Sequence, residues 1–425
     1  WLTEEGKLRV LCATTTIAQG INFPVSSIFL SSRFHAGIGG HEMSYRDFWN
    51  LCGRAGRIGQ EILGIVGVAA QEGDPAPAEF IRRSSGDVAS RLLEMVDELL
   101  ALAREFRLNA VRNDEAWSAF RSYVAHMWAE SQDPKSIIQN TESVLRNTLG
   151  YSSMQAEGGQ RNAERTQALI DVTREYVGHL ANSPATAVLA DATGFDPTGV
   201  QRALGGLRQL TYLDKDAWSA DTLFGPSSVL NDLVGVMMRV PQIRNSMKEL
   251  GGDGLDETRI ADVAKAWVRG DSLEQIARRF FEGSDDNLTD SLGDACRSLY
   301  RALAAPGAWG LAALSKLPSS GLDFDRLSDE EREAINSLPA LIYHGVSTEE
   351  AVLMRMNAVP RRIAQQLGEM YVSAISDARA RRSPTQARNF IAALAAADWE
   401  RAVRAGSAMS GADYQTVWRR LSGVA

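Results

Sequence analysis

The 425-residue sequence has little cysteine, no long apolar run and a shortage of positive charge. Three cysteines, an odd number in a long chain, argue against a disulfide framework and indicate a reducing compartment, so we expect a cytoplasmic protein. The longest apolar stretch, Ile62–Ala70, contains glycines and is too short to cross a membrane. With 45 Lys and Arg against 53 Asp and Glu, the net charge is −8, so any nucleic-acid site must be a local basic surface.

Catalytic spacings based on cysteine, histidine or serine are also missing. The five histidines are scattered, and no Cys-x-x-Cys, His-Glu-x-x-His or Gly-x-Ser-x-Gly pattern occurs. These absences argue against a zinc site and against a serine nucleophile at a strand-to-helix turn, and we predict no metal site. The composition, 44% hydrophobic and 23% charged, is that of folded globular domains, and the length predicts about three of them.

The first seventy or so residues differ from the remainder. Leu8–Ala13, Ser27–Leu30 and Ile62–Ala70 are short runs rich in Val, Ile and Leu, with helical stretches between them. That alternation predicts a parallel sheet covered by helices. Beyond Gly73 the strand signal nearly disappears and helical patterns follow one another. The predicted fold class is therefore an α/β lobe fragment with a partial parallel sheet, followed by mostly α-helical domains.

Helix-start signals divide the helical part. A cap residue followed by proline occurs at Ser183–Pro184 and at Asp196–Pro197, and Leu210–Leu213 is a candidate strand, which together suggest a winged-helix or helix-turn-helix unit. A second helix-turn-helix resemblance runs from Tyr343 to Arg361 and Arg362. We predict capping boxes at three pairs: Ser272 with Gln275, Ser328 with Glu331, and Ser347 with Glu350.

Two motifs in the first sixty residues carry chemistry. Ala13–Pro24 reads Ala-Thr-Thr-Thr-Ile-Ala-Gln-Gly-Ile-Asn-Phe-Pro and directly follows a predicted strand, where free N–H groups and hydroxyls suit a phosphate. Asn50–Arg57 reads Asn-Leu-Cys-Gly-Arg-Ala-Gly-Arg, which sets Arg54 and Arg57 three positions apart on one side of a helical turn. Two guanidinium groups so placed suit a triphosphate. Either motif alone more often has a purely structural role, but the two together in this order favour a phosphate-binding role.

The two motifs resemble motifs V and VI of superfamily 2 helicases, and their wording is most similar to the Ski-like branch. The resemblance implies two RecA-like lobes, a winged helix and a helical ratchet bundle. It divides the chain into residues 1–75, part of the second RecA-like lobe; 76–225, a helical and winged-helix region; 226–320, a ratchet-like bundle; and 321–425, a carboxy-terminal helical domain.

The resemblance also implies a role for particular residues. Arg54 and Arg57 would contact the γ-phosphate of ATP held on the other lobe, Asn50 would lie beside them, and Arg297 with Arg301 would face a strand threading the bundle. The implied catalytic residues are Arg54, Arg57 and Asn50; the nucleotide-binding residues are Gly20, Asn22 and Gly53; and the nucleic-acid-binding residues are Thr14, Thr15, Arg297 and Arg301.

Two departures from the family pattern matter. Asn50 stands where the family usually has Gln. No Gly-x-x-x-x-Gly-Lys-Ser/Thr and no Asp-Glu-x-His/Asp sequence is present. ATP and Mg²⁺ would therefore be bound mainly by a first lobe that this sequence does not contain, and we expect the chain alone to be inactive.

The sequence therefore favours the carboxy-terminal part of an ATP-dependent helicase or translocase that moves on single-stranded nucleic acid, with DNA slightly favoured over RNA. Its partners would be that nucleic acid and the missing amino-terminal lobe. Two alternatives stay open. One is a non-catalytic, helicase-derived scaffold that docks a protein partner. The other is a winged-helix nucleic-acid-binding protein built on Thr186–Leu213, against which the acidic chain counts modestly.

Overall fold

The computed structural model describes residues 27–31, 48, 65–69, 91–146, 160–282, 287–403 and 407–423. The chain divides into two compact units. One unit comprises residues 1–97 and 149–157, and the other comprises residues 98–148 and 158–425. The limits of the four predicted domains stay predictions.

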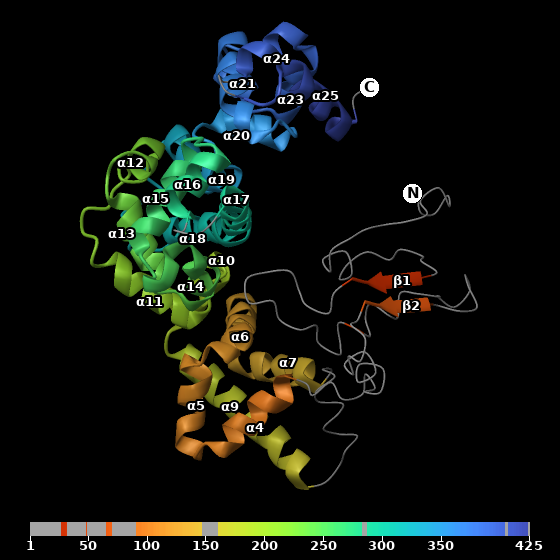
Figure 1. Ribbon diagram of the computed structural model, residues 1–425. Coiled ribbons are helices and arrows are strands. Elements are labelled where there is room, and N and C mark those ends of the chain that lie inside the picture. Colours follow the sequence, from red (N-terminus) through yellow and green to blue (C-terminus); the bar gives the residue numbers. More distant parts are fainter. Residues whose placement is uncertain are drawn as a thin grey trace. The chain divides into compact units, whose positions relative to one another are not determined.

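The first unit contains two paired strands (Figure 1). Strands β1 (Ser27–Leu30) and β2 (Ile65–Val68) run parallel, in a register that opposes Ser27 to Ile65 and Leu30 to Val68. Parallel neighbours need a long crossover connection, and 34 positions of sequence lie between Leu30 and Ile65. The predicted strand at Ser27–Leu30 and the parallel arrangement are confirmed. The predicted strand at Leu8–Ala13 lies outside the described residues.

The described residues of the second unit form helices. Its first helices are α4 (Arg91–Ala101), which crosses the division at residue 97, α5 (Arg104–Asn113), η2 (Glu115–Trp117), α6 (Ser118–Ser131), α7 (Pro134–Arg146), α9 (Gln160–Ala181), α10 (Pro184–Thr193) and α11 (Pro197–Leu207). The middle of the unit contains α12 (Ala220–Phe224), α13 (Val229–Met238), α14 (Pro241–Met247), the 3₁₀-helix η3 (Lys248–Gly254), α15 (Glu257–Val268), α16 (Leu273–Phe280), α17 (Leu288–Arg297), the π-helix η4 (Ser298–Ala304) and α18 (Ala305–Ser315). The carboxy-terminal helices are α19 (Asp329–His344), α20 (Glu349–Met356), α21 (Arg361–Ala374), α22 (Ala378–Arg381), α23 (Pro384–Ala393), α24 (Ala396–Ala402) and α25 (Gly411–Ser422).

A buried ion pair ties α6 to the start of α11. The side chains of Arg121 and Asp196 are each 1% exposed, and Arg121 donates to Asp196 Oδ2 from Nε at 2.9 Å and from Nη2 at 2.5 Å. Nη1 of the same arginine donates to the carbonyls of Val111 and Asp114. Asp196 also caps α11, because its Oδ1 accepts from the N–H of Gly199 at 2.6 Å. One carboxylate thus begins a helix and fixes it against its neighbour.

Tryptophans supply the other long-range ties. Trp218 donates its indole N–H to the carbonyl of Ser320, Trp267 to that of Ile342, and Trp418 to that of Asn357, at 2.7 to 2.8 Å. Each of these three rings is 1% exposed. Trp309 donates likewise to Thr193, which joins α18 to α10. A sequence with few aromatic residues therefore uses them to join segments that are distant along the chain.

The helix starts agree with the sequence in most places. The capping boxes of Ser272 with Gln275 and of Ser328 with Glu331 are formed, and both Ser-Pro and Asp-Pro starts are found at α10 and α11. The box predicted at Ser347 is wrong: Thr348 caps α20 instead, and the Ser347 hydroxyl bonds to Gln365.

The candidate strand at Leu210–Leu213 is also wrong, because that segment is a turn that joins α11 to α12. Residues 160–282 are all described and contain no strand. The apolar residues of this turn anchor it without strand pairing, since Leu213 is buried while the hydroxyl of Tyr212 bonds to Asp232 on α13 at 2.5 Å. A helix pair is present there, and the wing that would complete a winged helix is not formed within that range.

Candidate nucleic-acid interface

The motif residues of the first unit lie outside the described residues. These are Thr14, Thr15, Gly20, Asn22, Asn50, Gly53, Arg54 and Arg57. What the structure gives nearby is the strand pair: β1 begins three positions after Pro24, and β2 begins eight positions after Arg57. Because the two strands are parallel neighbours, both motifs are followed by strands that begin at the same edge of the sheet.

Arg297 and Arg301 lie on one continuous helical segment of the second unit. Asn287 starts α17 by accepting from the N–H of Asp290, and the helix then passes through the π-helical stretch η4 into α18. Leu299, Ala302 and Leu303 turn into the core, so the neighbouring Arg301 is left exposed. π-helical turns are rare, and they occur frequently at functional sites.

The two arginines differ in their partners. Arg297 is 37% exposed and its Nη1 lies 3.0 Å from Asp294 Oδ1, one turn earlier on the same helix. Arg301 makes no ion pair or side-chain hydrogen bond within the described part of the chain. An exposed pair with an adjacent carboxylate contributes little to stability, so both guanidinium groups remain accessible to phosphates.

Tyr300 is a residue of this surface that the sequence analysis missed. Its ring is 54% exposed and meets the buried Trp267 edge-on, with 5.5 Å between ring centroids. An exposed aromatic ring held by a buried one, directly beside Arg301, is a platform on which a base can stack. The sequence could have indicated this residue, because Tyr300 lies between Arg297 and Arg301 along the chain.

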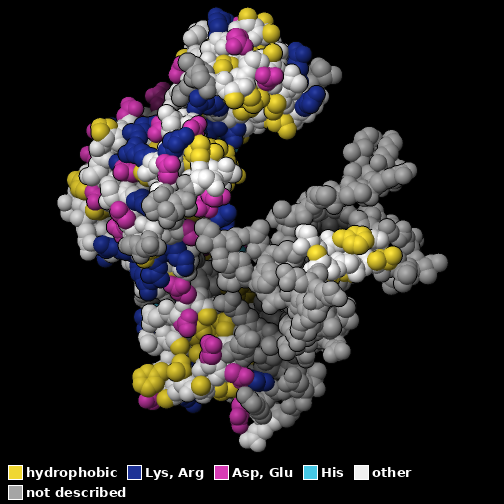
Figure 2. Space-filling view, in the orientation of Figure 1, with side chains coloured by type: hydrophobic (Ala, Val, Ile, Leu, Met, Phe, Trp, Pro, Cys, Tyr) yellow, Lys and Arg dark blue, Asp and Glu magenta, His cyan; other side chains and the backbone are white. Residues whose placement is uncertain are grey.

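The pair α10 and α11 presents a second basic surface. Arg202 and Arg208 are exposed, and Arg239 at the end of α13 is exposed as well and donates to Gln209 at 3.0 Å. The same α13 arginine passes close to Gly206 of α11. Figure 2 shows Lys and Arg side chains gathered over α11 and α14. Arg202 and Arg208 are therefore open to solvent on this surface.

The second helix-turn-helix resemblance is corrected by the position of Arg361. Its guanidinium group donates to the carbonyls of Gly345, at 2.7 Å, Asp271, at 2.9 Å, and Trp267, and it lies 3.9 Å from the centroid of a Trp267 ring. The hydrogen bonds occupy the edge of the guanidinium group, and the Trp267 ring covers its face. Arg361 therefore fastens α21 to the ends of α15 and α19 and is not available to a nucleic-acid backbone.

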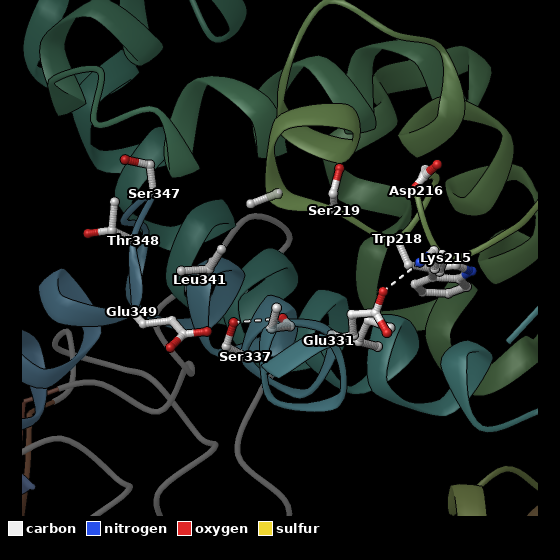
Figure 3. Close-up of a pocket in the computed structure, with 13 residues that line it drawn as sticks. Lys215, Asp216, Trp218, Ser219, Glu331, Ser337, Leu341, Ser347, Thr348 and Glu349 are labelled. Atoms are coloured by element: carbon white, nitrogen blue, oxygen red, sulfur yellow. Dashed lines mark hydrogen bonds and ion pairs between the residues drawn. The ribbon is translucent and has the colours of Figure 1, made fainter. Parts of the chain in front are cut away.

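A groove of about 320 Å³ lies between the 215–220 segment, α19 and the start of α20 (Figure 3). Lys215 Nζ and Glu331 Oε1 lie 2.6 Å apart at one side of it, and this bond raises the pKa of the lysine and lowers that of the carboxyl. Asp216 and Glu349 add further negative charge to its lining. Such a mixed surface does not select phosphate.

The described residues hold no group of three or more His, Cys, Asp or Glu side chains that could bind a metal ion. Among the same residues, every helix is too short or too polar to traverse a lipid bilayer.

Parts of the chain are similar to known helicases. The chain is 38% identical over 92 residues to the antiviral helicase SKI2 of Saccharomyces cerevisiae, a match that covers 21% of this chain and 7% of that protein. It is 28% identical over 118 residues to the ATP-dependent DNA helicase Hel308 of Caldivirga maquilingensis, which covers 22% and 16%. It is 26% identical over 191 residues to DNA polymerase theta of Drosophila melanogaster, which covers 42% and 9%.

The chain thus spans less than a fifth of the length of these relatives. No model of a known protein family matches it. The similarity supports a helicase-related chain, in agreement with the motifs in its first sixty residues.

Proposed function

We propose that the chain is the carboxy-terminal part of an ATP-dependent helicase or translocase acting on single-stranded nucleic acid. The observation that carries the proposal is the combination of the two motifs with the parallel pairing of β1 and β2. Both motifs are followed by strands that pair in parallel, which is the α/β arrangement that the family resemblance implies. The partial similarity to two proteins named as helicases supports the same conclusion.

ATP and Mg²⁺ would be bound mainly by an amino-terminal lobe that supplies the phosphate loop and the acidic box. Arg54 and Arg57 would reach its γ-phosphate, with Asn50 beside them, while Gly20, Asn22 and Gly53 would line the nucleotide side of the cleft. Arginine fingers of this kind contribute about 10³–10⁵ in rate in analogous phosphoryl-transfer enzymes. The two motifs would then sense whether ATP is intact and couple that state to closure of the lobes.

The nucleic acid would be held through its backbone and by stacking. Thr14 and Thr15 would contact phosphates from the first unit, and Arg297 and Arg301 from the second. The exposed ring of Tyr300 between these arginines suits a base of an unpaired strand, because the bases of a duplex are already stacked on one another. Neither contact reads sequence, so we expect single-stranded nucleic acid to bind without a sequence requirement, and DNA remains the slightly favoured substrate of the proposal.

The test is an ATPase assay of the complete gene product, with single-stranded DNA and RNA added as competing stimulants. Arg54→Ala and Arg57→Ala should each lower kcat by about a thousandfold while nucleic-acid binding is kept. Arg278→Ala is the matched control, because Arg278 is an exposed arginine of α16 that pairs with Glu274. Stimulation by neither nucleic acid would overturn the motor and favour the scaffold.

The alternative of a plain winged-helix regulator is weakened by the turn at Leu210–Leu213, which leaves the helix pair without its wing. It predicts duplex binding that is unaffected by Arg54→Ala and no ATP turnover in the complete protein.

A further inference from the structure

A small cavity lies where the end of α5 meets α9 and the first turns of α10 and α11. Its volume is about 20 Å³. The polar groups that matter in its lining are Arg112, Tyr176, His179, Ser183, Thr186 and Gln201. No Asp or Glu of the described chain lines it, and the nearby carboxylate of Asp196, which acts on the pKa of Tyr176, is paired with Arg121.

Arg112 brings a full positive charge to this cavity. Its guanidinium group makes no ion pair and no hydrogen bond to the described residues, although the side chain is half-buried. Its backbone is fixed, because its carbonyl accepts from the hydroxyl of Thr198 at 2.7 Å. Burial and then the charge of Arg112 lower the pKa of His179, which is how a site short of negative charge acts on a nearby imidazole.

Tyr176 adds a hydroxyl group at the cavity. The residue is 1% exposed and lines the cavity, and its ring packs 5.8 Å from Phe120 and 6.2 Å from His179. Its hydroxyl makes no hydrogen bond within the described residues. Burial raises the pKa of this phenol, so it stays protonated and can donate. Because this hydroxyl bonds to no described residue, it is available to donate to an acceptor that enters the cavity.

The amino ends of two helices, α10 and α11, lie at the cavity. The helix α10 has ten residues and begins after Ser183, whose side chain makes no capping bond. The helix α11 has eleven residues and begins at Pro197, but its amino end is already capped by the carboxylate of Asp196, so α10 offers the open amino end. Residues from both first turns line the cavity. Helix amino ends carry partial positive charge and favour phosphate oxygens.

We propose that this cavity binds a phosphate group of the nucleic-acid backbone. A space of about 20 Å³ holds roughly one water-sized atom, so one phosphate oxygen would enter and accept from Tyr176 while Arg112 meets the others at the rim. The proposal rests on the proposed function only in taking nucleic acid as the source of the phosphate. It adds a third backbone contact, separate from Arg297 and Arg301.

Fluorescence anisotropy of the full chain with labelled single-stranded and duplex DNA, over a range of salt concentrations, tests the site. Arg112→Gln should raise Kd about tenfold and reduce the salt dependence by about one phosphate contact. Tyr176→Phe removes only the hydroxyl and should raise Kd about threefold. Arg104→Gln, on the same helix but 76% exposed and outside the cavity, is the charge-matched control and should change Kd less than about twofold.

A second measurement separates the sources of phosphate. Inorganic phosphate, compared with chloride at equal ionic strength, should raise the Tm of the wild type but not that of Tyr176→Phe. Protection by phosphate together with no DNA binding would overturn the backbone assignment and the nucleic-acid part of the proposed function. Normal DNA affinity in both cavity variants would overturn this site alone and leave the proposed function standing. If Arg112→Gln fails to fold, the DNA affinity of Tyr176→Phe and the effect of phosphate on its Tm decide whether the site binds phosphate.

Discussion

Two helix-turn-helix segments of the second unit use polar groups in opposite ways. In the α10–α11 segment, Arg112 and the hydroxyl of Tyr176 line a cavity beside the two helix amino ends, and neither side chain bonds to a described residue. In the α19–α21 segment, Arg361 reaches the carboxyl ends of α15 and α19 and gives its donors to their carbonyls. The first arrangement leaves donors open to an anion from outside, and the second is complete in itself.

The difference follows from which helix end an arginine approaches. The last carbonyls of a helix have no partner within it and carry partial negative charge, so a nearby guanidinium group is satisfied there. The first N–H groups carry the opposite charge and leave an arginine without a partner. A basic residue beside a helix-turn-helix is therefore a candidate for phosphate binding only where helix amino ends surround it.

The largest effect should come from breaking the ion pair that supports the first segment. Arg121→Met leaves the carboxylate of Asp196 buried without its partner, and we expect the free energy of unfolding to fall by about 4 kcal/mol. Urea unfolding measures it. Arg202→Met, an exposed arginine on α11, is the control and should change stability by less than about 0.5 kcal/mol. An equal, small effect of both variants would show that the pair does not hold α11.

A smaller loss is expected from the second segment. Arg361→Gln removes the carbonyl bonds and the stacking on Trp267, which should cost about 3 kcal/mol in urea unfolding. Arg361→Lys should not restore it, because a single ammonium group cannot span carbonyls from two helices. The neighbouring Arg362→Gln is the control. Unchanged stability with weakened DNA binding in Arg361→Gln would mean that Arg361 binds nucleic acid after all.

The sequence predicted local structure well where one residue decides it. Cap residues at Ser272, Ser328 and Asp196 act through neighbours three positions away, so their patterns are visible along the chain. The strands were visible for a different reason, because short runs of Val, Ile and Leu alternate with helical stretches in the first seventy residues. Ser347 and Thr348 are both good caps, and local pattern alone could not choose between them.

Contacts between distant segments were not predictable in the same way. Arg361 looked like a phosphate ligand because the carbonyls that bind it lie 16 to 94 positions away. Met356 is 58% exposed, whereas Met354, two positions earlier on α20, is buried, and residue type alone does not distinguish the two. The cavity at Arg112 is formed by residues from four helices, and no sequence motif predicts it. The motif residues of the first unit, Arg54 and Arg57 among them, stay predictions.

The surface at η4 should respond through binding and not through stability. The double variant Arg297→Ala, Arg301→Ala should raise the Kd for single-stranded DNA about tenfold and lower the salt dependence by about two phosphates. Its unfolding free energy should barely change, because both side chains are exposed. Arg326→Ala, an exposed arginine paired only with Asp323, is the control. Unaltered binding by the double variant would remove this surface from the proposed interface.

The smallest expected effect is the pH dependence of stability that comes from one histidine in each segment, His179 and His344. Burial lowers the pKa of both His179 and His344 from 6.5, and the nearby charges of Arg112 and Arg355 lower them further. Below pH 6.5 the unfolded chain binds protons that these folded imidazoles do not, so stability falls as the pH drops from 7 through 6 and towards each folded pKa. Removing either imidazole, by His179→Gln or His344→Gln, should flatten that fall.

Phosphate should act on only one of these histidines. If it binds beside Arg112, its negative charge offsets the guanidinium group and the pKa of His179 rises back towards 6.5, which NMR titration of the imidazole protons can follow. His344 lies beside Arg355 in the segment whose carbonyls already hold Arg361, and its pKa should stay where it is. Equal shifts at both histidines would mean that phosphate acts through general screening, and the contrast between amino and carboxyl helix ends would then not govern anion binding in this chain.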